Sequence, residues 1–555
     1  MDKEQIRLYA IEEYERWKKN TLDDPSMQKE LAELAGSEEE VIDAFCAHLR
    51  FGTSGIRGVL GPGTNRMNEY VVRRTTQGLA NYLNRTYAAP SVIIACDTRR
   101  KSRIFAEETA GVLRGNGIKV YLFDRLATVS LLSYGTRMLG CTMGIMITAS
   151  HNPKIFNGYK VYSSEGYQIV GSVCNEILKE IDSVDFFDDI RTSDQGIISV
   201  DQEVEDSFIK EIVSMAPVKA SETEALNKER LRVVYTPLNG TGNFYVRKVL
   251  TEIGFPHLVV VESQELPDEN FSTCPTPNPE KITAFNEGFK VLDKVDGDII
   301  IATDPDCDRV GVCIYHDGMK VLLTGNQLGV LMLDYLCQVK PPSDGQLLIK
   351  SIVTTPLAAK IAERHGLKVC NTLTGFKYIG EIIAKLDAEG KKDRYYFGFE
   401  ESHGYLMNPF IRDKDGVSSA MLTVCLAAYH KAQGRDLLQR LHEIYREYGP
   451  SYDKTRSFSF EGPYGKMAMD KVMDFFRQDV RESLGGFAVT EKIDYMEETG
   501  LPKADVVSFT LENSTQVVIR PSGTEPKIKL YLFESESGSG IEQALKSIVE
   551  SFKNA

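Results

Sequence analysis

Short apolar segments rich in isoleucine recur along this 555-residue chain, and each ends in a small polar loop. Such loops begin near positions 97, 150, 304 and 400, with helical stretches between them. Strands and helices that alternate in this way form layered α/β units, and their ligand loops lie at the carboxyl ends of the strands. The pattern therefore predicts repeated α/β units, repeated in spacing rather than in residue identity.

A chain of this length should hold several domains, at roughly 100–200 residues each. We expect four, which cover residues 1–216, 217–323, 324–447 and 448–555. The helical, charge-rich segment 201–216 is predicted as a connector at the end of the first domain.

Charge and cysteine content restrict the partners and the compartment. The net charge of −14 makes nucleic acid and anionic membrane surfaces poor partners. The ten cysteines are scattered without C-x-x-C or zinc spacing, which favours a reduced, cytoplasmic protein. We expect no membrane span, because no window holds about 18 consecutive apolar residues. We expect no secretory signal, because residues 1–20 are dense in charge and lack an apolar core, and they are predicted as an amphipathic helix.

A serine loop follows the apolar segment 143–147, which is predicted as a buried strand. The loop is Thr148-Ala149-Ser150-His151-Asn152-Pro153. A serine here can expose its hydroxyl beside free N–H groups, as a covalent phosphoryl carrier requires. The same residues also favour an ordinary turn. The sequence has no G-x-S-x-G elbow, and the adjacent Ser150 and His151 are no evident nucleophile–base pair.

Three carboxylates occupy alternate positions in a second loop. Asp304, Asp306 and Asp308 follow a predicted strand at 299–302. Alternate side chains share one side of an extended backbone, and two unit charges about 4 Å apart interact by about 4 kcal/mol at an effective dielectric of about 20. A hard cation such as Mg²⁺ would relieve this repulsion. An EF-hand is excluded, because Arg309 and Tyr315 stand where it needs glycine and glutamate.

Arg57 and Lys160 stand in glycine-containing segments of the first predicted domain. Three glycines bracket Arg57 in residues 51–58, so backbone N–H groups can approach an anion while the arginine supplies charge. Residues 157–160, Asn-Gly-Tyr-Lys, predict a hairpin turn from which Lys160 could reach Ser150. A plain glycine-rich turn and a solvated lysine are equally consistent with these segments.

Two later loops combine acceptors, hydroxyls and glycine. Residues 398–404 follow a predicted strand and suit a ligand rich in hydroxyl groups, such as a sugar, or form an exposed acidic turn. Residues 520–527 lie between two predicted strands. Their arginine, two hydroxyls and Gly523 can surround a phosphate, or the segment is a simple hairpin.

Four loops in this order resemble those of the α-D-phosphohexomutase superfamily, and of the phosphoglucomutases in particular. They are residues 148–153, 304–309, 398–404 and 520–527, and the resemblance spans nearly the whole chain from residue 51. It implies an α/β fold of four domains around a central cleft. Three would be similar mixed-sheet α/β units, and the fourth a smaller, more mobile C-terminal α+β domain.

The resemblance also implies roles for single residues. Ser150 would be the phosphoserine and, with Asp304, Asp306 and Asp308, would bind one Mg²⁺ per chain. The expected catalytic residues are Ser150, His151, Arg57, Lys160 and Lys414, and His151, Lys160 or Lys414 would remove the proton of the sugar hydroxyl. The expected substrate-binding residues are Arg309, Thr374, Gly375, Lys377, Glu400, Ser402, Arg520, Ser522, Gly523 and Thr524.

The implied reaction is a reversible mutase reaction between glucose 1-phosphate and glucose 6-phosphate, with glucose 1,6-bisphosphate as intermediate and activator. A mutase for mannose 1-phosphate or a pentose 1-phosphate is an alternative, as is a glucose 1,6-bisphosphate synthase with an external donor. A sensor without catalysis is disfavoured, because a pure binder needs no nucleophile. We expect sugar phosphates as the partners and a monomer or weak homodimer.

Overall fold

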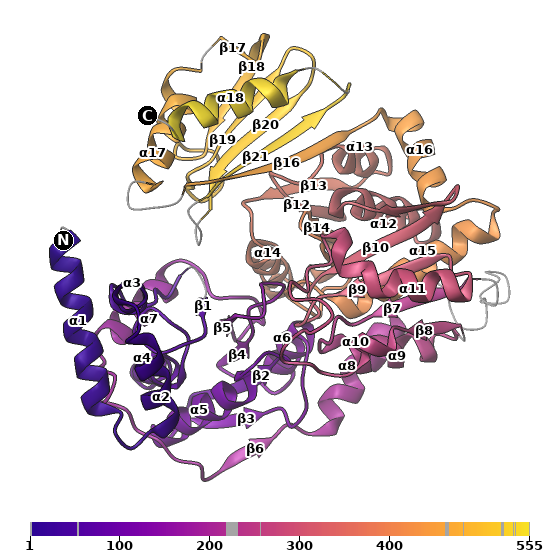
Figure 1. The fold of residues 1–555 in the computed structure, drawn as a ribbon. Coiled ribbons are helices and arrows are strands. Elements are labelled where there is room, and N and C mark those ends of the chain that lie inside the picture. Colours follow the sequence, from indigo (N-terminus) through magenta and orange to yellow (C-terminus); the bar gives the residue numbers. More distant parts are fainter. Residues whose placement is uncertain are drawn as a thin grey trace.

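The computed structural model describes residues 3–52, 55–217, 231–255, 257–460, 465–480, 482–522, 527–536, 538 and 540–553. The strands form four sheets that follow one another along the chain. Figure 1 shows the corresponding units along an arc, from the indigo N-terminal helices to the yellow C-terminal sheet. Each sheet lies inside one of the four predicted domain ranges, although the exact bounds of the domains stay a prediction.

The first sheet has the strand order β1-β5-β4-β2-β3-β6. Strand β5 is antiparallel to β1 and β4, and the other neighbours are parallel, so the sheet is mixed. The strands are β1 (Gly55–Val59), β2 (Ser91–Cys96), β3 (Lys119–Leu122), β4 (Met143–Ile147), β5 (Phe156–Ser163) and β6 (Ile197–Ser199). The helices of this unit are α1 (Lys3–Asn20), α2 (Pro25–Leu34), α3 (Glu38–Phe45), α4 (Glu69–Thr86), α5 (Ser102–Gly115), α6 (Val129–Met138), α7 (Ser172–Asp182) and α8 (Gln202–Ser214).

The hairpin expected at Asn157-Gly158 is wrong, because both residues lie inside β5. The buried Asn157 amide donates to Arg100 O and Ser102 Oγ, each at 3.0 Å. A Cβ at Gly158 would lie 2.7 Å from Thr148 O, so glycine is required by close packing rather than by a turn. This placement puts Lys160 on a strand paired with β4 instead of on a loop.

The second sheet has the order β11-β10-β9-β7-β8. Residues 304–309, which are predicted to bind the metal ion and are called the metal loop below, join β9 to its antiparallel neighbour β10. The strands are β7 (Val233–Thr236), β8 (Leu258–Val260), β9 (Ile299–Thr303), β10 (Val310–His316) and β11 (Met319–Leu322). The helices are α9 (Gly242–Glu252), α10 (Glu262–Glu265), η3 (Ile282–Phe285) and α11 (Asn286–Val295).

The third sheet has the order β13-β12-β14-β15, with one antiparallel pair at its edge. The strands are β12 (Leu347–Ser351), β13 (Lys368–Thr372), β14 (Tyr395–Glu400) and β15 (Gly404–Leu406). The predicted loop 398–404 is therefore strand up to Glu400. The helices are α12 (Gly325–Val339), α13 (Pro356–Arg364), α14 (Phe376–Ala388), η4 (Lys392–Arg394), α15 (Gly416–Ala432) and α16 (Leu437–Tyr448).

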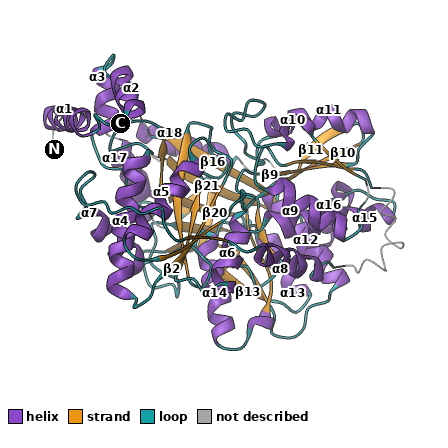
Figure 2. Cartoon of the chain, turned by 90° about the horizontal axis from the view of Figure 1, so that it is seen from below, coloured by secondary structure: helices purple, strands orange, loops and turns teal. Residues whose placement is uncertain are grey.

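The fourth sheet is antiparallel throughout, in the order β16-β21-β20-β19-β18-β17. The strands are β16 (Tyr452–Ser459), β17 (Ser483–Leu484), β18 (Phe487–Asp494), β19 (Val507–Leu511), β20 (Gln516–Pro521) and β21 (Lys527–Glu534). Helices α17 (Gly465–Gln478) and α18 (Ile541–Lys553) belong to this unit. Three mixed sheets and one antiparallel sheet with helices confirm the predicted fold class, and Figure 2 shows the helices around the strands.

The apolar cores explain how the units are joined. One buried cluster runs through the first three units and includes Ile93, Val233 and Leu348. The fourth unit has a separate core, which includes Val472 and Ile528. Among the described residues, no helix is long and apolar enough to cross a membrane.

An ion-pair cluster joins the first and third units. Arg412, which is 0% exposed, and Arg137 both bind the carboxylate of Asp387 on α14. Arg137 also donates to Phe410 O at 2.7 Å. Burial and the neighbouring Arg137 lower the pKa of Arg412 to about 10, although Asp387 opposes both effects. Asp387 is thus the carboxylate that compensates two neighbouring guanidinium groups.

We predict that Asp387→Ala lowers the free energy of unfolding by about 2 kcal/mol, because the buried guanidinium of Arg412 loses its closest carboxylate. The melting temperature, measured by calorimetry, should fall by about 2 °C. The matched control is Glu363→Ala, which removes an exposed carboxylate on α13. Equal melting temperatures for the two variants would contradict the role of Asp387.

Candidate active site

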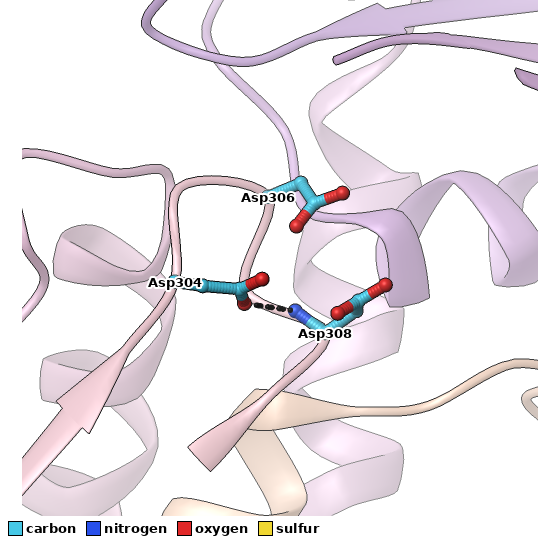
Figure 3. A group of neighbouring side chains, drawn as sticks. All are labelled: Asp304, Asp306 and Asp308. Atoms are coloured by element: carbon cyan, nitrogen blue, oxygen red, sulfur yellow. Dashed lines mark hydrogen bonds between the residues drawn. The ribbon is translucent and has the colours of Figure 1, made fainter. Parts of the chain in front are cut away.

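The three aspartates of the metal loop are buried side by side (Figure 3). One carboxylate oxygen of each lies within 4.8 Å of the others. Asp304 Oδ1 accepts hydrogen bonds from the backbone N–H of Asp308 at 3.1 Å and of Arg309 at 2.9 Å, so the loop curls around its first residue. Cys307 is in the left-handed region, with φ 53°, which completes the turn.

This group of carboxylates could hold a metal ion. Oδ1 of Asp306 and Oδ1 of Asp308 are buried and have no hydrogen-bond partner within the described part of the chain. Burial and the two neighbouring carboxylates raise the pKa of Asp304 well above its usual range. Buried, unpaired carboxylate oxygens so close together are the ligand set of a hard divalent cation.

Cations from the first and third units face this loop, in addition to Arg309 of the loop itself. Lys160 Nζ, from the first unit, lies 2.8 Å from Asp306 Oδ2 and 3.6 Å from Asp308 Oδ2. Lys414 Nζ, from the third unit, lies 3.1 Å from Asp308 Oδ2. Burial opposes the charged form of Asp308, but Lys414, Lys160 and Arg309 outweigh it and lower the pKa of that carboxyl. The predicted residues Lys160 and Lys414 are therefore brought together at the metal loop.

Ser150 reaches the same place from the first unit. Its Oγ donates to Asp304 Oδ2 at 3.0 Å and lies 3.1 Å from His151 Nδ1. Its φ of 54° is left-handed, and its N–H donates to Thr148 Oγ1 at 2.8 Å. Burial and nearby cations, Arg309 first, lower the pKa of His151 well below its usual range. This shift favours the neutral form of the imidazole.

Arg99 was not predicted as a site residue, yet it fixes the serine loop. Its guanidinium donates to the backbone oxygens of Ser150, Asn152, Pro153 and Phe156, the last three at 2.6, 3.0 and 3.1 Å. Its position in the chain could have indicated this role, because its loop follows β2, which is the parallel neighbour of β4 in the sheet.

Asp97 and Thr148 extend this framework to the metal loop. Asp97 pairs with Arg99 at 3.3 Å and accepts from Thr148 Oγ1 at 2.6 Å. The same hydroxyl oxygen lies 3.2 Å from Asp306 Oδ2. Arg57, on β1, adds a hydrogen bond of 3.2 Å from its Nη1 to Asn152 Oδ1. The serine loop is therefore held on both sides.

The predicted sugar-binding residues lie on the third unit. Glu400, at the end of β14, is buried and accepts from Gly375 N at 2.7 Å. Thr374 Oγ1 is buried without a hydrogen-bond partner within the described residues. Ser402 is half-buried in the turn after β14, and Lys377 is half-buried in the first turn of α14, where its charge interacts with Cys174 of α7.

The predicted sugar-binding loop, residues 398–404, contacts the metal loop directly. Val310 N donates to His403 O, and His403 Nδ1 lies near Val310 O, both at 3.1 Å. Burial raises the pKa of Glu400, while Lys414, Arg309 and Arg520 lower it. These three cations therefore interact electrostatically with the Glu400 carboxylate.

The C-terminal loop is only partly described. Arg520 donates from Nη2 to Tyr531 Oη at 3.1 Å, and Ser522 N donates to Lys527 O at 2.7 Å across the β20–β21 hairpin. Gly523 and Thr524 lie outside the described residues. Their expected contact with phosphate stays a prediction.

Comparisons with known proteins agree with this architecture. Models of the phosphoglucomutase/phosphomannomutase α/β/α domains I, II and III match residues 48–188, 206–318 and 324–448. A phosphoglucomutase of Staphylococcus epidermidis is 36% identical over 538 residues, which cover 93% of this chain and 96% of the relative. One of Staphylococcus saprophyticus is 36% identical over 516 residues, 89% of this chain and 92% of the relative.

Two solved structures share the fold. A phosphomannomutase of Thermus thermophilus, described as putative in its title, has a TM-score of 0.69 at 22% identity and covers 91% of this chain and 99% of its own. Parafusin of Paramecium, a phosphoglucomutase, has a TM-score of 0.68 at 16% identity and covers 92% of this chain and 95% of its own.

Fold and similarity together define an enzyme of the phosphohexomutase class. Such an enzyme is an isomerase that moves a phosphoryl group from one position of a sugar phosphate to another, as the sequence predicted. More particularly, the chain belongs to the phosphoglucomutase/phosphomannomutase family.

We predict that Arg99→Lys lowers kcat by about ten- to a hundredfold, since one ammonium group cannot span four carbonyl oxygens and the serine would lose its orientation. A coupled phosphoglucomutase assay measures this change. Arg100→Ala, which removes the exposed neighbouring side chain, is the control and should keep its activity. Full activity of Arg99→Lys would show that the loop needs no such framework.

Proposed function

We propose that this protein is a phosphoglucomutase that interconverts α-D-glucose 1-phosphate and glucose 6-phosphate. The observation that carries the proposal is the position of Ser150, whose Oγ lies 3.0 Å from Asp304 Oδ2 at the edge of three buried aspartates. The similarity to curated phosphoglucomutases over most of the chain supports the same activity.

In the proposed reaction the phosphoryl group moves from Ser150 to the sugar and back. The bond between phosphorus and Oγ breaks, a bond to O6 of glucose 1-phosphate forms, and the O6 proton passes to a base. The glucose 1,6-bisphosphate then turns over, and Ser150 takes the 1-phosphoryl group while O1 regains a proton.

Three residues were expected as the possible base: His151, Lys160 and Lys414. His151 has the strongest support, because its imidazole is neutral and lies 3.1 Å from Ser150 Oγ. Burial would lower the pKa of Lys414, but Asp308 and Asp413 outweigh burial and raise it, so this lysine stays charged. We assign Lys414, with Lys160 and Arg57, to charge compensation of the transferring phosphoryl group.

The residues at the metal loop fit Mg²⁺. Asp304, Asp306, Asp308 and the phosphate on Ser150 would hold one ion, through hard oxygen ligands only. When bound, the ion would offset the negative charge of the phosphoryl group. Lys160 and Lys414 already compensate part of the carboxylate charge at this place.

The remaining positions are proposed to bind the substrate at its two ends. Glu400, Ser402, Thr374, Gly375 and Lys377 would contact the sugar and its hydroxyl groups. The non-reacting phosphate would be held by Arg520, Ser522, Gly523 and Thr524, and Arg309 would bind the substrate beside the metal loop. The protein would act in the cytoplasm as a monomer or weak homodimer, with sugar phosphates as its partners.

A ³¹P NMR time course tests the proposed reaction. Purified protein with Mg²⁺ and a trace of glucose 1,6-bisphosphate would receive glucose 1-phosphate, mannose 1-phosphate and ribose 1-phosphate in one tube. We expect the glucose signal to convert first, because Glu400 and Ser402 suit a hexose. Ser150→Ala should show no turnover, since the phosphoryl carrier is gone.

Retained activity of Ser150→Ala would contradict the covalent scheme. Preferential conversion of ribose or mannose would transfer the proposal to a mutase for that sugar. Conversion only with an external phosphoryl donor would indicate a glucose 1,6-bisphosphate synthase.

We further predict that Asp306→Ala removes both activity and Mg²⁺ binding, because two carboxylates and a phosphate cannot complete the ligand set. Titration calorimetry with Mg²⁺ alone measures the affinity without turnover. The control is Asp387→Ala, whose carboxylate lies outside the metal loop and should leave Mg²⁺ affinity unchanged. Wild-type Mg²⁺ affinity in Asp306→Ala would place the ion elsewhere.

A further inference from the structure

Residues 271–281 of the second unit touch three parts of the active site. The ring of Phe271 lies 5.2 Å from the guanidinium of Arg99. Pro275 O accepts a hydrogen bond of 3.2 Å from Lys154 N, just after the serine loop. Glu280 forms an ion pair with Arg309 of the metal loop. We name this segment the brace. No sequence motif indicated a functional role for it.

Hydrogen bonds and close packing fix the backbone at the end of the brace, next to Glu280. Glu280 N donates to the buried Asn278 Oδ1, and Lys281 N donates to Asn278 O, both at 3.0 Å. A Cβ on Gly311 would lie 2.2 Å from Pro279 O, so the brace packs directly on the backbone of β10. Glu280 is thus held beside the strand that follows Arg309.

Arg309 has little else to orient it. The bond from its Nη1 to Glu280 is the only hydrogen bond of its side chain to another described residue. Its Nε is buried without a hydrogen-bond partner in the described part of the chain, 3.7 Å from Asp308 Oδ1. Burial would lower the pKa of Arg309, but Glu280 and then Asp308 outweigh it.

We propose that Glu280 is a positioning residue for substrate binding. It holds the guanidinium of Arg309 through Nη1, so that the other donors of the planar fork face the substrate's phosphate in a fixed geometry. Since the pair carries no net charge, Arg309 recognises phosphate by the geometry of its donors more than by long-range attraction. This inference rests on the proposed function, because it deepens the role of Arg309 there.

The test compares Glu280→Ala, Glu280→Gln, Glu280→Asp and Arg309→Ala with the wild type. Glu280→Ala should raise KM for glucose 1-phosphate about tenfold and leave kcat within about twofold, as expected for binding lost equally in ground and transition states. Glu280→Gln keeps an acceptor oxygen and should restore KM to within about threefold. Glu280→Asp keeps the negative charge, but its side chain is one methylene shorter and its carboxylate lies farther from Arg309. This variant should therefore resemble Glu280→Ala.

A double-mutant cycle shows whether Glu280 acts through Arg309. Glu280→Ala should add nothing to KM in the Arg309→Ala background. Full additivity would overturn the proposal, and so would a lowered KM in Glu280→Ala, which would mean that Glu280 competes with the substrate for Arg309. Melting temperatures check that each variant is folded, and the milder Gln and Asp variants decide the matter if the alanine variant unfolds.

Failure of this inference and failure of the proposed function give different results. Absence of wild-type turnover would overturn the proposed function. Wild-type turnover with an unchanged KM in Glu280→Ala would overturn the inference alone. Calorimetric binding of glucose 6-phosphate to the Ser150→Ala form, with and without Glu280→Ala, gives a readout independent of turnover, and we expect about tenfold weaker binding without Glu280.

Discussion

The repulsion among three buried carboxylates is the constraint on which the rest of this structure depends. Asp304, Asp306 and Asp308 belong to one loop of the second unit, and among the described residues of that unit only Arg309 forms an ion pair with them. Lys160 comes from the first unit and Lys414 from the third. Because each unit supplies a charge that another one needs, the site exists only when all three are packed together.

The parts of the site that follow directly after strands could be predicted from the sequence. Ser150 and the three aspartates lie on such loops, and the structure places the serine hydroxyl 3.0 Å from Asp304. The alternation of strands and helices predicts that the ligand loops lie at the carboxyl ends of the strands. The error at Asn157-Gly158 has a physical reason, since glycine serves close strand packing at this position as well as it serves a turn.

The roles of Arg99 and Glu280 could not be predicted from local sequence patterns. Each acts through a contact that is long-range in sequence: Arg99 with the carbonyl oxygens of a loop some fifty residues later, and Glu280 with an arginine 29 residues later. Nothing in the residues around Glu280 distinguishes it from other acidic side chains of loops. Such partners become visible only when the packing of the units is known.

The distribution of apolar cores has a consequence for cooperativity. One continuous cluster links the first three units, and the first and second units also have smaller cores of their own. The C-terminal sheet shares no residue with that linking cluster and meets the third unit through a small group that includes Val353 and Tyr531. Units that share a core unfold together, and a unit with a separate core can open alone at a lower free energy. The chain should therefore consist of two cooperative blocks, of which the smaller carries Arg520. Transient opening of that block would admit and release sugar phosphates while the carboxylates, their lysines and Ser150 remain assembled.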